Sequence, residues 1–380
     1  MISIIITPIV KEFLKGLIMK KLLLILGSIA SINAFANGKI TYGNGNFYFL
    51  SGDNRYFYKL SNDFSIKQKY QTAGAHENIQ STVYANNSIE AVGTDNPDYA
   101  FKVSNDLKVT ASLLKHDLYD VSYVNGKYTT VGDGIYSSLD GLTWSPEYSP
   151  NGTYKSIAYG NGRYVAVGDG VLSASKDQNT NTWQTMPGID STSGLNKIVY
   201  GNGTFVAVGN SRHIYYSLNG TSWNSTNIQG GNSDDIKSVA YCPSSNTFVA
   251  VGSKMGIYTS QNGISWQQTI VHGTGTLFDV SCNQNGRIVA VGEDTTIISS
   301  FDGYNWHSSK INVDDKGTFF WVEHSTDNSS FLAAGNNGFM YTSLDGETWN
   351  ELHTEAVKEI STTTLNPKPT RISQTTVRFW

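Results

Sequence analysis

The sequence has few charged residues and lacks the local motifs of metal sites, phosphate-binding loops and serine nucleophiles. Each absence excludes or disfavours a class of function. Charged residues make up 15 % of the 380 residues, and the formal net charge is −4. Since no cluster of Lys or Arg occurs either, a strongly basic nucleic-acid binder is excluded. The His and Cys residues show no zinc spacing, and the sequence lacks a Gly-x-Ser-x-Gly elbow, a phosphate loop with a Lys and an Asp-x-Asp-x-Asp-Gly calcium loop. We therefore expect no metal and no cofactor.

A long uninterrupted apolar run is also missing. Residues 19–36 combine a basic start, an apolar core and an Ala-Phe-Ala cleavage signal, which is typical of a secretory signal peptide. Charged residues interrupt the apolar residues of 1–36, so the ~20-residue span of a bilayer is not reached. We predict that 19–36 is the true signal and 1–18 an upstream extension. The mature chain would then be exported, either periplasmic or secreted, with no membrane span, and we expect a monomer. An N-terminal membrane anchor is the alternative.

Glycine, by contrast, returns at regular intervals, each time closing a short apolar run such as Ala-Val-Gly. The periodic glycines are Gly52, Gly93, Gly132, Gly168, Gly209, Gly252, Gly292 and Gly335, with steps of 41, 39, 36, 41, 43, 40 and 43 residues. Tryptophan keeps the same period at Trp144, Trp183, Trp223, Trp266, Trp306 and Trp349. Two markers with one period indicate tandem copies of one unit, whose length fits a four-stranded propeller blade.

Within one copy, Gly and Asn separate four short β-rich runs. In the fifth copy these runs are 197–200, 205–208, 213–217 and a last run that opens at Ser222. Runs of this length between turn residues are typical of strands rather than helices. The sequence therefore predicts an all-β fold, a β-propeller of about eight four-stranded blades over residues 37–352. Seven blades are the alternative, because the first two copies are degenerate.

A turn motif, Ser-x-Asp/Asn-Gly-x-x-Trp, recurs in five copies. Its Asp or Asn can accept backbone N–H bonds, Gly takes the positive φ, and Trp packs between neighbouring sheets. The residues with this structural role are Asp140, Trp144, Asn219, Trp223, Asn262, Trp266, Asp302, Trp306, Asp345 and Trp349. The turn resembles the Asp box, or bacterial neuraminidase repeat, of the sialidase-like propellers, although here Asp directly precedes Gly. The resemblance covers roughly residues 38–352 and implies a folding role for the turn, on the face away from the ligand site.

Sialidase activity is not expected, in spite of this resemblance. Sialidases clamp a carboxylate with three Arg, and the chain has Arg55, Arg163, Arg212, Arg287, Arg371 and Arg378. Arg163 and Arg287 each follow Asn-Gly in a first hairpin turn, which should place them on the face opposite the ligand site. Arg371 and Arg378 belong to the tail, so a three-Arg clamp is hard to assemble.

The residues that follow the periodic glycines are the candidate ligand site. In a propeller these turns share one face with the links between blades, so ring closure would gather a polar, partly acidic rim around the channel mouth. The candidate ligand-binding residues are Asp53, Asp133, Asp169, Asn210, Glu293 and Asn336. The preference of a Gly-led turn for Asp and Asn explains the same residues without any ligand. The links predicted to carry specificity are 67–80, 110–119, 145–155, 184–196, 224–237, 267–278 and 307–318.

The two cysteines and the tail raise two further predictions. Cys242 and Cys282 each lie ten residues before their periodic Gly, so they hold the same place in neighbouring copies. Inner strands of neighbouring blades lie side by side and an exported protein meets an oxidising compartment, so a disulfide is one hypothesis; two separate buried thiols are the other. The tail, 353–380, is not another copy and is a candidate for an outer strand that closes the ring.

The sequence predicts an exported, non-enzymatic binding or scaffold protein that recognises a glycan or protein partner through its loop face. A glycoside hydrolase or lyase with carboxylates at the channel mouth is the first alternative, because two carboxylates from distant blades leave no local motif. An assembly factor for a membrane complex is the second, since the turns also resemble those of photosystem II stability factors. Enzyme activity is thus left open, with binding preferred.

Overall fold

The computed structural model describes residues 40–359, apart from 51–55, 66, 72–77, 95–98, 105–108, 115, 150–151, 177–181, 188, 190–193, 227, 229–233, 274, 312–316, 328, 336–339 and 353–357. The predicted signal peptide and most of the tail lie outside the described residues, and the domain limits stay predictions. Among the residues described, no helix is long and apolar enough to cross a bilayer.

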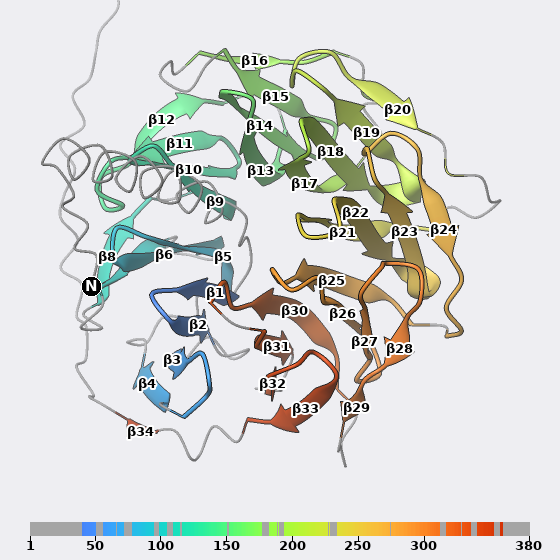
Figure 1. Ribbon diagram of the computed structural model, residues 1–380. Helices are drawn as coiled ribbons and strands as arrows, with labels where there is room; N and C mark the ends of the chain where they lie inside the picture. The colour runs from blue at the N-terminus through green and yellow to red at the C-terminus, as the bar shows by residue number, and fades with distance from the viewer. Residues whose placement is uncertain are drawn as a thin grey trace, which may run out of the picture.

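Eight antiparallel sheets of four strands surround one axis, so the fold is all-β and the protein is an eight-bladed propeller (Figure 1). Each blade is one continuous chain segment, and the two degenerate copies form complete blades 1 and 2. The sequence prediction of about eight blades is confirmed.

The strands of each blade follow one another from the axis outward. The inner strands, which we call the hub, are β1 (Ile40–Gly43), β5 (Asn78–Ala85), β9 (Leu118–Val124), β13 (Tyr154–Gly160), β17 (Leu195–Gly201), β21 (Ile236–Cys242), β25 (Leu277–Cys282) and β30 (Phe319–His324). The second strands are β2 (Asn46–Leu50), β6 (Ser88–Thr94), β10 (Lys127–Gly132), β14 (Arg163–Gly168), β18 (Thr204–Gly209), β22 (Thr247–Gly252), β26 (Ile288–Gly292) and β31 (Phe331–Gly335). The third are β3 (Tyr56–Ser61), β7 (Tyr99–Ser104), β11 (Ile135–Ser138), β15 (Leu172–Ser175), β19 (Ile214–Ser217), β23 (Gly256–Ser260), β27 (Ile297–Ser300) and β32 (Met340–Ser343). The outer strands are β4 (Lys67–Gln71), β8 (Val109–Leu113), β12 (Ser145–Tyr148), β16 (Trp183–Thr185), β20 (Asn224–Thr226), β24 (Gln267–Thr269), β28 (His307–Ser308) and β33 (Thr348–Glu351).

Burial decreases from the second strand of a blade to the outer one. β18 and β22 are buried at every residue, whereas β28 is exposed at both. The Val- and Ala-rich second strands read as continuous apolar runs because they pack against a blade on each side. The outer strands are short and polar, and most of their residues fall inside the segments predicted to be links. That part of the prediction is wrong, because polar edge residues resemble loop residues in sequence.

Packing between blades 8 and 1 closes the ring. β1 lies beside β30, and side chains of both blades share one apolar cluster that includes Ile40, Phe47, Leu332 and Met340. Two short strands add a fifth, parallel strand to these two blades: β29 (Lys310–Ile311) pairs with β33, and β34 (Lys358–Glu359) pairs with β4. β34 brings the chain from blade 8 to the outer edge of blade 1 (Figure 1).

The alternation of strand direction gives the propeller two different faces. The turns after the periodic glycines and the links between blades lie on one, which we call the link face; the first and third turns of each blade lie on the other, the turn face. Backbone bonds fit this division: the N–H of Asn210 donates to the carbonyl of Gly194 in the preceding link (2.8 Å), and the Asn161 amide of blade 4 donates to Leu218 O in the third turn of blade 5 (3.3 Å).

The Ser-x-Asp/Asn-Gly turns are held by their own side chains. In the copy around Asp302, its Oδ1 accepts the N–H groups of Tyr304 and Asn305, both at 2.8 Å, while Ser300 Oγ accepts the N–H of Gly303 at 2.9 Å. Asn219 accepts the two corresponding bonds in its own turn. In four of the turns the Trp indole donates back to the Gly carbonyl, as Trp306 does at 2.8 Å. These bonds leave the Asp or Asn occupied within the turn.

A disulfide joins Cys242 and Cys282, the last residues of β21 and β25 in neighbouring blades. Their Cα atoms are 5.4 Å apart, within the usual range for such a bond. Both residues are buried in the apolar cluster between blades 6 and 7.

Glu90 is a wholly buried carboxyl on β6, between blades 2 and 3. It contacts the turn at Gly141, and neither of its carboxylate oxygens has a hydrogen-bond partner among the described residues. Burial raises the pKa of Glu90 well above its ordinary 4.5, although the charge of Lys102 acts against this. The folded protein therefore keeps a proton that the unfolded chain releases above about pH 4.5, so Glu90 lowers stability progressively as the pH rises.

We expect Glu90→Met to stabilise the protein at pH 8 by about 1–3 kcal/mol, the usual cost of a buried polar group without a partner. The gain should be smaller near pH 4, where wild-type Glu90 is largely protonated in both states and only the cost of burying its neutral carboxyl remains. Thermal melts from pH 4 to 8 measure this, with the exposed Glu351→Gln as the matched control. An equal gain at all pH values, or a loss at pH 8, would contradict the burial argument.

Candidate functional site

Every hub strand of blades 2 to 8 breaks its pairing register near its start, at the third residue of β5 and at the second residue of the other six. In blade 5, for example, Leu195 pairs with Gly209 and Lys197 with Val208, so Asn196 is an extra residue. The same β-bulge occurs in the other six blades. A bulge re-aims the side chain it carries, and these bulges all lie at the link-face end of the hub.

We call the ring of bulge residues the hub mouth. It consists of Gln80, Tyr119, Lys155, Asn196, Lys237, Phe278 and Phe320, all of them half-buried. The backbone frame repeats around the ring, but the side chains vary among amide, phenol, ammonium and phenyl groups. On one side, the rings of Phe278 and Phe320 lie 5.0 Å apart, and Phe320 lies 5.4 Å from Trp321.

Two of the predicted rim residues, Asp133 and Asp169, lie on the link face and are half-exposed ion-pair partners. Asp133 accepts a bond from the Tyr136 hydroxyl at 2.9 Å and contacts Nδ1 of His116 at 2.9 Å. Asp169 contacts Nζ of the mouth residue Lys155 at 2.5 Å. Both carboxylates are therefore already bonded to side chains of the same blade or of the link that precedes it.

Asn210 and Glu293 also lie beside the hub. The amide of Asn196 donates to Asn210 Oδ1 at 3.1 Å, and Glu293 Oε2 accepts the N–H of Thr276 at 2.9 Å. Asp53 and Asn336 lie outside the described residues. The four described members of the predicted set are therefore on one face, each with a local partner, and their role in ligand binding stays a prediction.

One residue further along each hub strand lies a polar belt that the sequence analysis missed. Its members are Ser81, Asp120, Ser156, Lys197, Ser238, Asp279 and Trp321, in blades 2 to 8. Serine alternates with a charged residue through six blades. The sequence did carry a signal for the belt, because its residues precede the periodic glycines by a nearly constant number of positions. Each belt residue nevertheless reads as a single polar interruption of an apolar strand.

Asp120 uses its carboxylate to join three blades. Its Oδ1 accepts a bond from Ser81 Oγ of blade 2 at 3.0 Å, and its Oδ2 accepts bonds from Ser156 Oγ and Ile157 N of blade 4 at 2.9 and 3.0 Å. Asp279 repeats this device in blade 7, accepting bonds from Ser238 Oγ and Val322 N at 2.9 and 3.1 Å. Belt carboxylates therefore link neighbouring blades.

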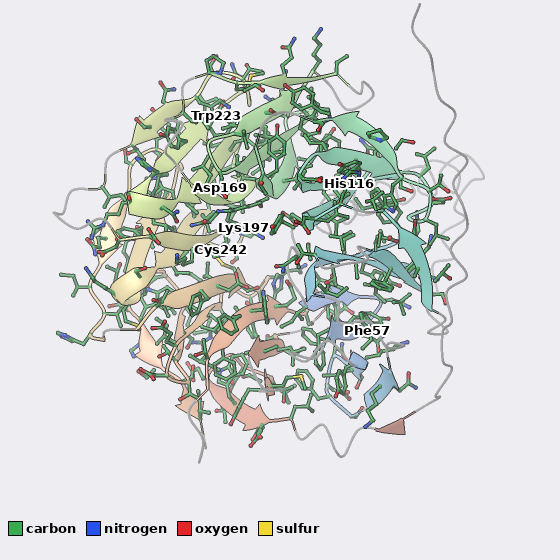
Figure 2. All side chains as sticks on the ribbon, turned by 180° about the vertical axis from the view of Figure 1, so that it is seen from behind. Phe57, His116, Asp169, Lys197, Trp223 and Cys242 are labelled. Carbon is green, nitrogen blue, oxygen red and sulfur yellow. A yellow bond between two sulfur atoms is a disulfide. The ribbon has the colours of Figure 1, made fainter. Side chains whose placement is uncertain are left out.

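The charge of Lys197 acts on both of these carboxylates. Burial raises the pKa of Asp120 and of Asp279, and the charge of Lys197 opposes the rise at both. It does the same at Glu323, where burial still raises the pKa to about 8. Lys197 lies close to the axis, whereas Trp223 of the same blade lies farther out (Figure 2). The positive charge of Lys197 thus partly offsets the effect of burial on carboxyl groups of three blades.

Glu323 and His324 form a second polar group, partly buried, on β30. Nδ1 of His324 lies 2.9 Å from Ser281 Oγ and 3.4 Å from Glu323 Oε1. Burial lowers the pKa of His324 to about 4, so the ring is neutral at neutral pH. Because the hydroxyl and the carboxylate approach the same ring nitrogen, this group lacks the relay geometry of a catalytic triad, in which they use different nitrogens.

A pocket of about 540 Å³ opens on the link face between blades 6 and 7. Apolar side chains, among them Met255, Val271 and Ile297, share its walls with His272 and Asp294. Within the part of the chain that the structure describes, no group of His, Cys, Asp or Glu is arranged to hold a metal ion.

Comparisons with known proteins agree with this architecture. No protein-family model and no curated protein matches the sequence. Among solved structures, YCF48 from Cyanidioschyzon merolae is similar with a TM-score of 0.53 and 13 % identity, over 70 % of this chain and 95 % of that one. The computationally designed Ika8 protein gives a TM-score of 0.63 at 10 % identity, over 82 % and 96 % of the two chains. The C-terminal WD40 domain of Sif2 gives 0.62 at 9 %, over 82 % and 95 %. At these identities the similarity shows the propeller fold alone.

Proposed function

We propose that this protein is an exported, non-enzymatic propeller that binds a glycan or protein partner on its link face, at the hub mouth. The bulges carry this proposal, because a strictly repeated backbone presents seven side chains of differing chemistry at one place. The turn face, in contrast, repeats nearly the same sequence in five blades, as a structural turn does. Varied side chains on a constant frame are typical of a recognition surface.

Two further observations support binding on this face. The pocket between blades 6 and 7 opens there, beside Met255 and Asp294. WD40 propellers such as the Sif2 domain share the fold, which supplies a rigid support for loops. The Asp-box-like turns also support the proposal that the chain belongs to the sialidase-like propellers, as a member that lacks their three-Arg clamp.

The binding proposal is tested with the full chain immobilised and screened against a glycan array and against peptide and protein extracts of its cell envelope. We expect saturable binding that Lys237→Ala and Phe320→Ala weaken and that substitution of Leu218, exposed on the turn face, leaves unchanged. Binding that only the Leu218 variant loses would contradict a site at the hub mouth. A co-purifying membrane complex would favour the assembly role.

A glycoside hydrolase is the second candidate function, and one observation favours it. Burial raises the pKa of Glu323 to about 8, and the nearby charge of Asp279 adds to this rise. A carboxyl that holds its proton beside a second carboxyl is an arrangement that an acid and a base can use. Turnover of chromogenic glycosides, abolished in Glu323→Gln and in Asp133→Asn or Asp169→Asn without loss of folding, would establish the enzyme. Binding without turnover supports our proposal.

A further inference from the structure

The hub mouth is unevenly divided between aromatic and polar side chains. Blades 7 and 8 contribute Phe278, Phe320 and Trp321, which are half-buried and in ring contact. At the same bulge, blades 4, 5 and 6 carry Lys155, Asn196 and Lys237. The other blades thus carry polar side chains at this position, whereas Phe278 and Phe320 keep apolar ring surface partly exposed. Such surface is available to a ligand.

The polar neighbour of this aromatic group is an ion pair. Lys237 Nζ contacts Asp235 Oδ2 at 2.9 Å, and the side chains are 30 % and 35 % exposed. Asp235 Oδ1 also accepts the N–H of Ser211 at 3.1 Å. The hydrogen bond from Lys237 and the N–H of Ser211 help to hold the pKa of Asp235 below its ordinary value in spite of burial. Blade 6 adjoins blade 7 around the hub, so Lys237 and Phe278 occupy the same bulge position in neighbouring blades.

The charges at the mouth point to a neutral ligand. Lys155 contacts Asp169 at 2.5 Å, and Lys237 contacts Asp235, so each mouth lysine already has a carboxylate partner. An anionic ligand would have to displace one of these partners. A ligand with hydroxyl groups can instead donate to the carboxylate and accept from the ammonium while the pair stays intact.

From this arrangement we infer that a neutral sugar ring stacks on Phe278 and Phe320 and bonds through its hydroxyls to Lys237 and Asp235. The C–H face of a pyranose carries partial positive charge, which the negative face of an aromatic ring attracts. Ring hydroxyls project from its edge, toward the ion pair. This inference rests on the proposed binding function and names the ligand class of the same site.

The test is isothermal titration calorimetry of the full chain with three neutral probes: cellohexaose, chitohexaose and maltohexaose. We expect at least one to bind, and Phe320→Ala to weaken that binding at least about tenfold, equivalent to about 1.4 kcal/mol. Phe320→Trp should retain binding within about threefold, because it keeps an aromatic face. Phe301→Ala is the matched control, since Phe301 is 58 % exposed on the turn face; melting temperatures verify that each variant folds.

Three results would overturn the inference: no hexasaccharide binds, binding survives Phe320→Ala, or Phe301→Ala weakens it equally. If a peptide or protein ligand binds instead and Lys237→Ala weakens that binding, the inferred sugar ligand is wrong, while the proposed binding function stands. If the bound ligand maps to the turn face, both are wrong.

Discussion

Asp120→Ala should lower the free energy of unfolding by about 3–5 kcal/mol, the range for breaking a buried, fully bonded charge. The substitution leaves the hydroxyls of Ser81 and Ser156 and the N–H of Ile157 without their acceptor. It also removes a carboxylate on which the charge of Lys197 acts. Since these groups belong to blades 2 and 4, the loss should loosen three blades together.

Urea denaturation measures this effect, with Asp133→Ala as the matched control. Asp133 has a half-exposed carboxylate with a histidine partner, and such a pair contributes under about 1 kcal/mol. Asp120→Asn keeps one acceptor oxygen, so we expect a smaller loss than for Asp120→Ala. If Asp120→Ala stays within 1 kcal/mol of wild type, the polar belt does not join the blades as described.

Removing the disulfide should cause the second large loss of stability. Cys242 and Cys282 are separated by 40 residues, and cross-linking a loop of this length stabilises a protein by about 3–4 kcal/mol in the chain-entropy model. Cys242→Ala with Cys282→Ala should therefore lower stability by that amount under oxidising conditions. Reduced wild type should melt close to the double variant.

Alkylation of the unfolded, unreduced protein verifies the bond directly. We expect no modified cysteine before reduction and two after it. Two alkylated thiols in the unreduced protein would leave the pair as separate buried cysteines, the alternative that the sequence left open.

The fold could be predicted from the sequence because each blade carries its own markers. In blades 3 to 8 the periodic glycine is the last residue of the second strand. An added Cβ on Gly209, for example, would collide with the Gly194 carbonyl of the link. The tryptophans pack beside their turns, where a large ring is required. Blades 1 and 2 lack the Trp turn, yet Phe47, Phe57 and Ile89 still provide buried strands.

The functional face was less accessible to sequence analysis. A β-bulge shifts the pairing by one residue, so Asn196 and Phe320 occupy places that simple alternation would assign to the other side of the strand. Belt residues such as Asp120 look like isolated charges until the blades on both sides supply Ser81 and Ser156. The four described rim residues could be placed on the correct face from the sequence, but the partners of Asp133 and Asp169 depend on neighbouring segments.

Hydrogen–deuterium exchange of the full chain, with and without the best ligand from the binding screen, tests the central claim most directly. Our account predicts slower exchange in segments 117–121, 195–198, 235–239 and 318–322, which surround the hub mouth, and no change in the turns around Asn219, Asp302 and Asp345. Protection confined to those turns, with the mouth unchanged, would contradict the account.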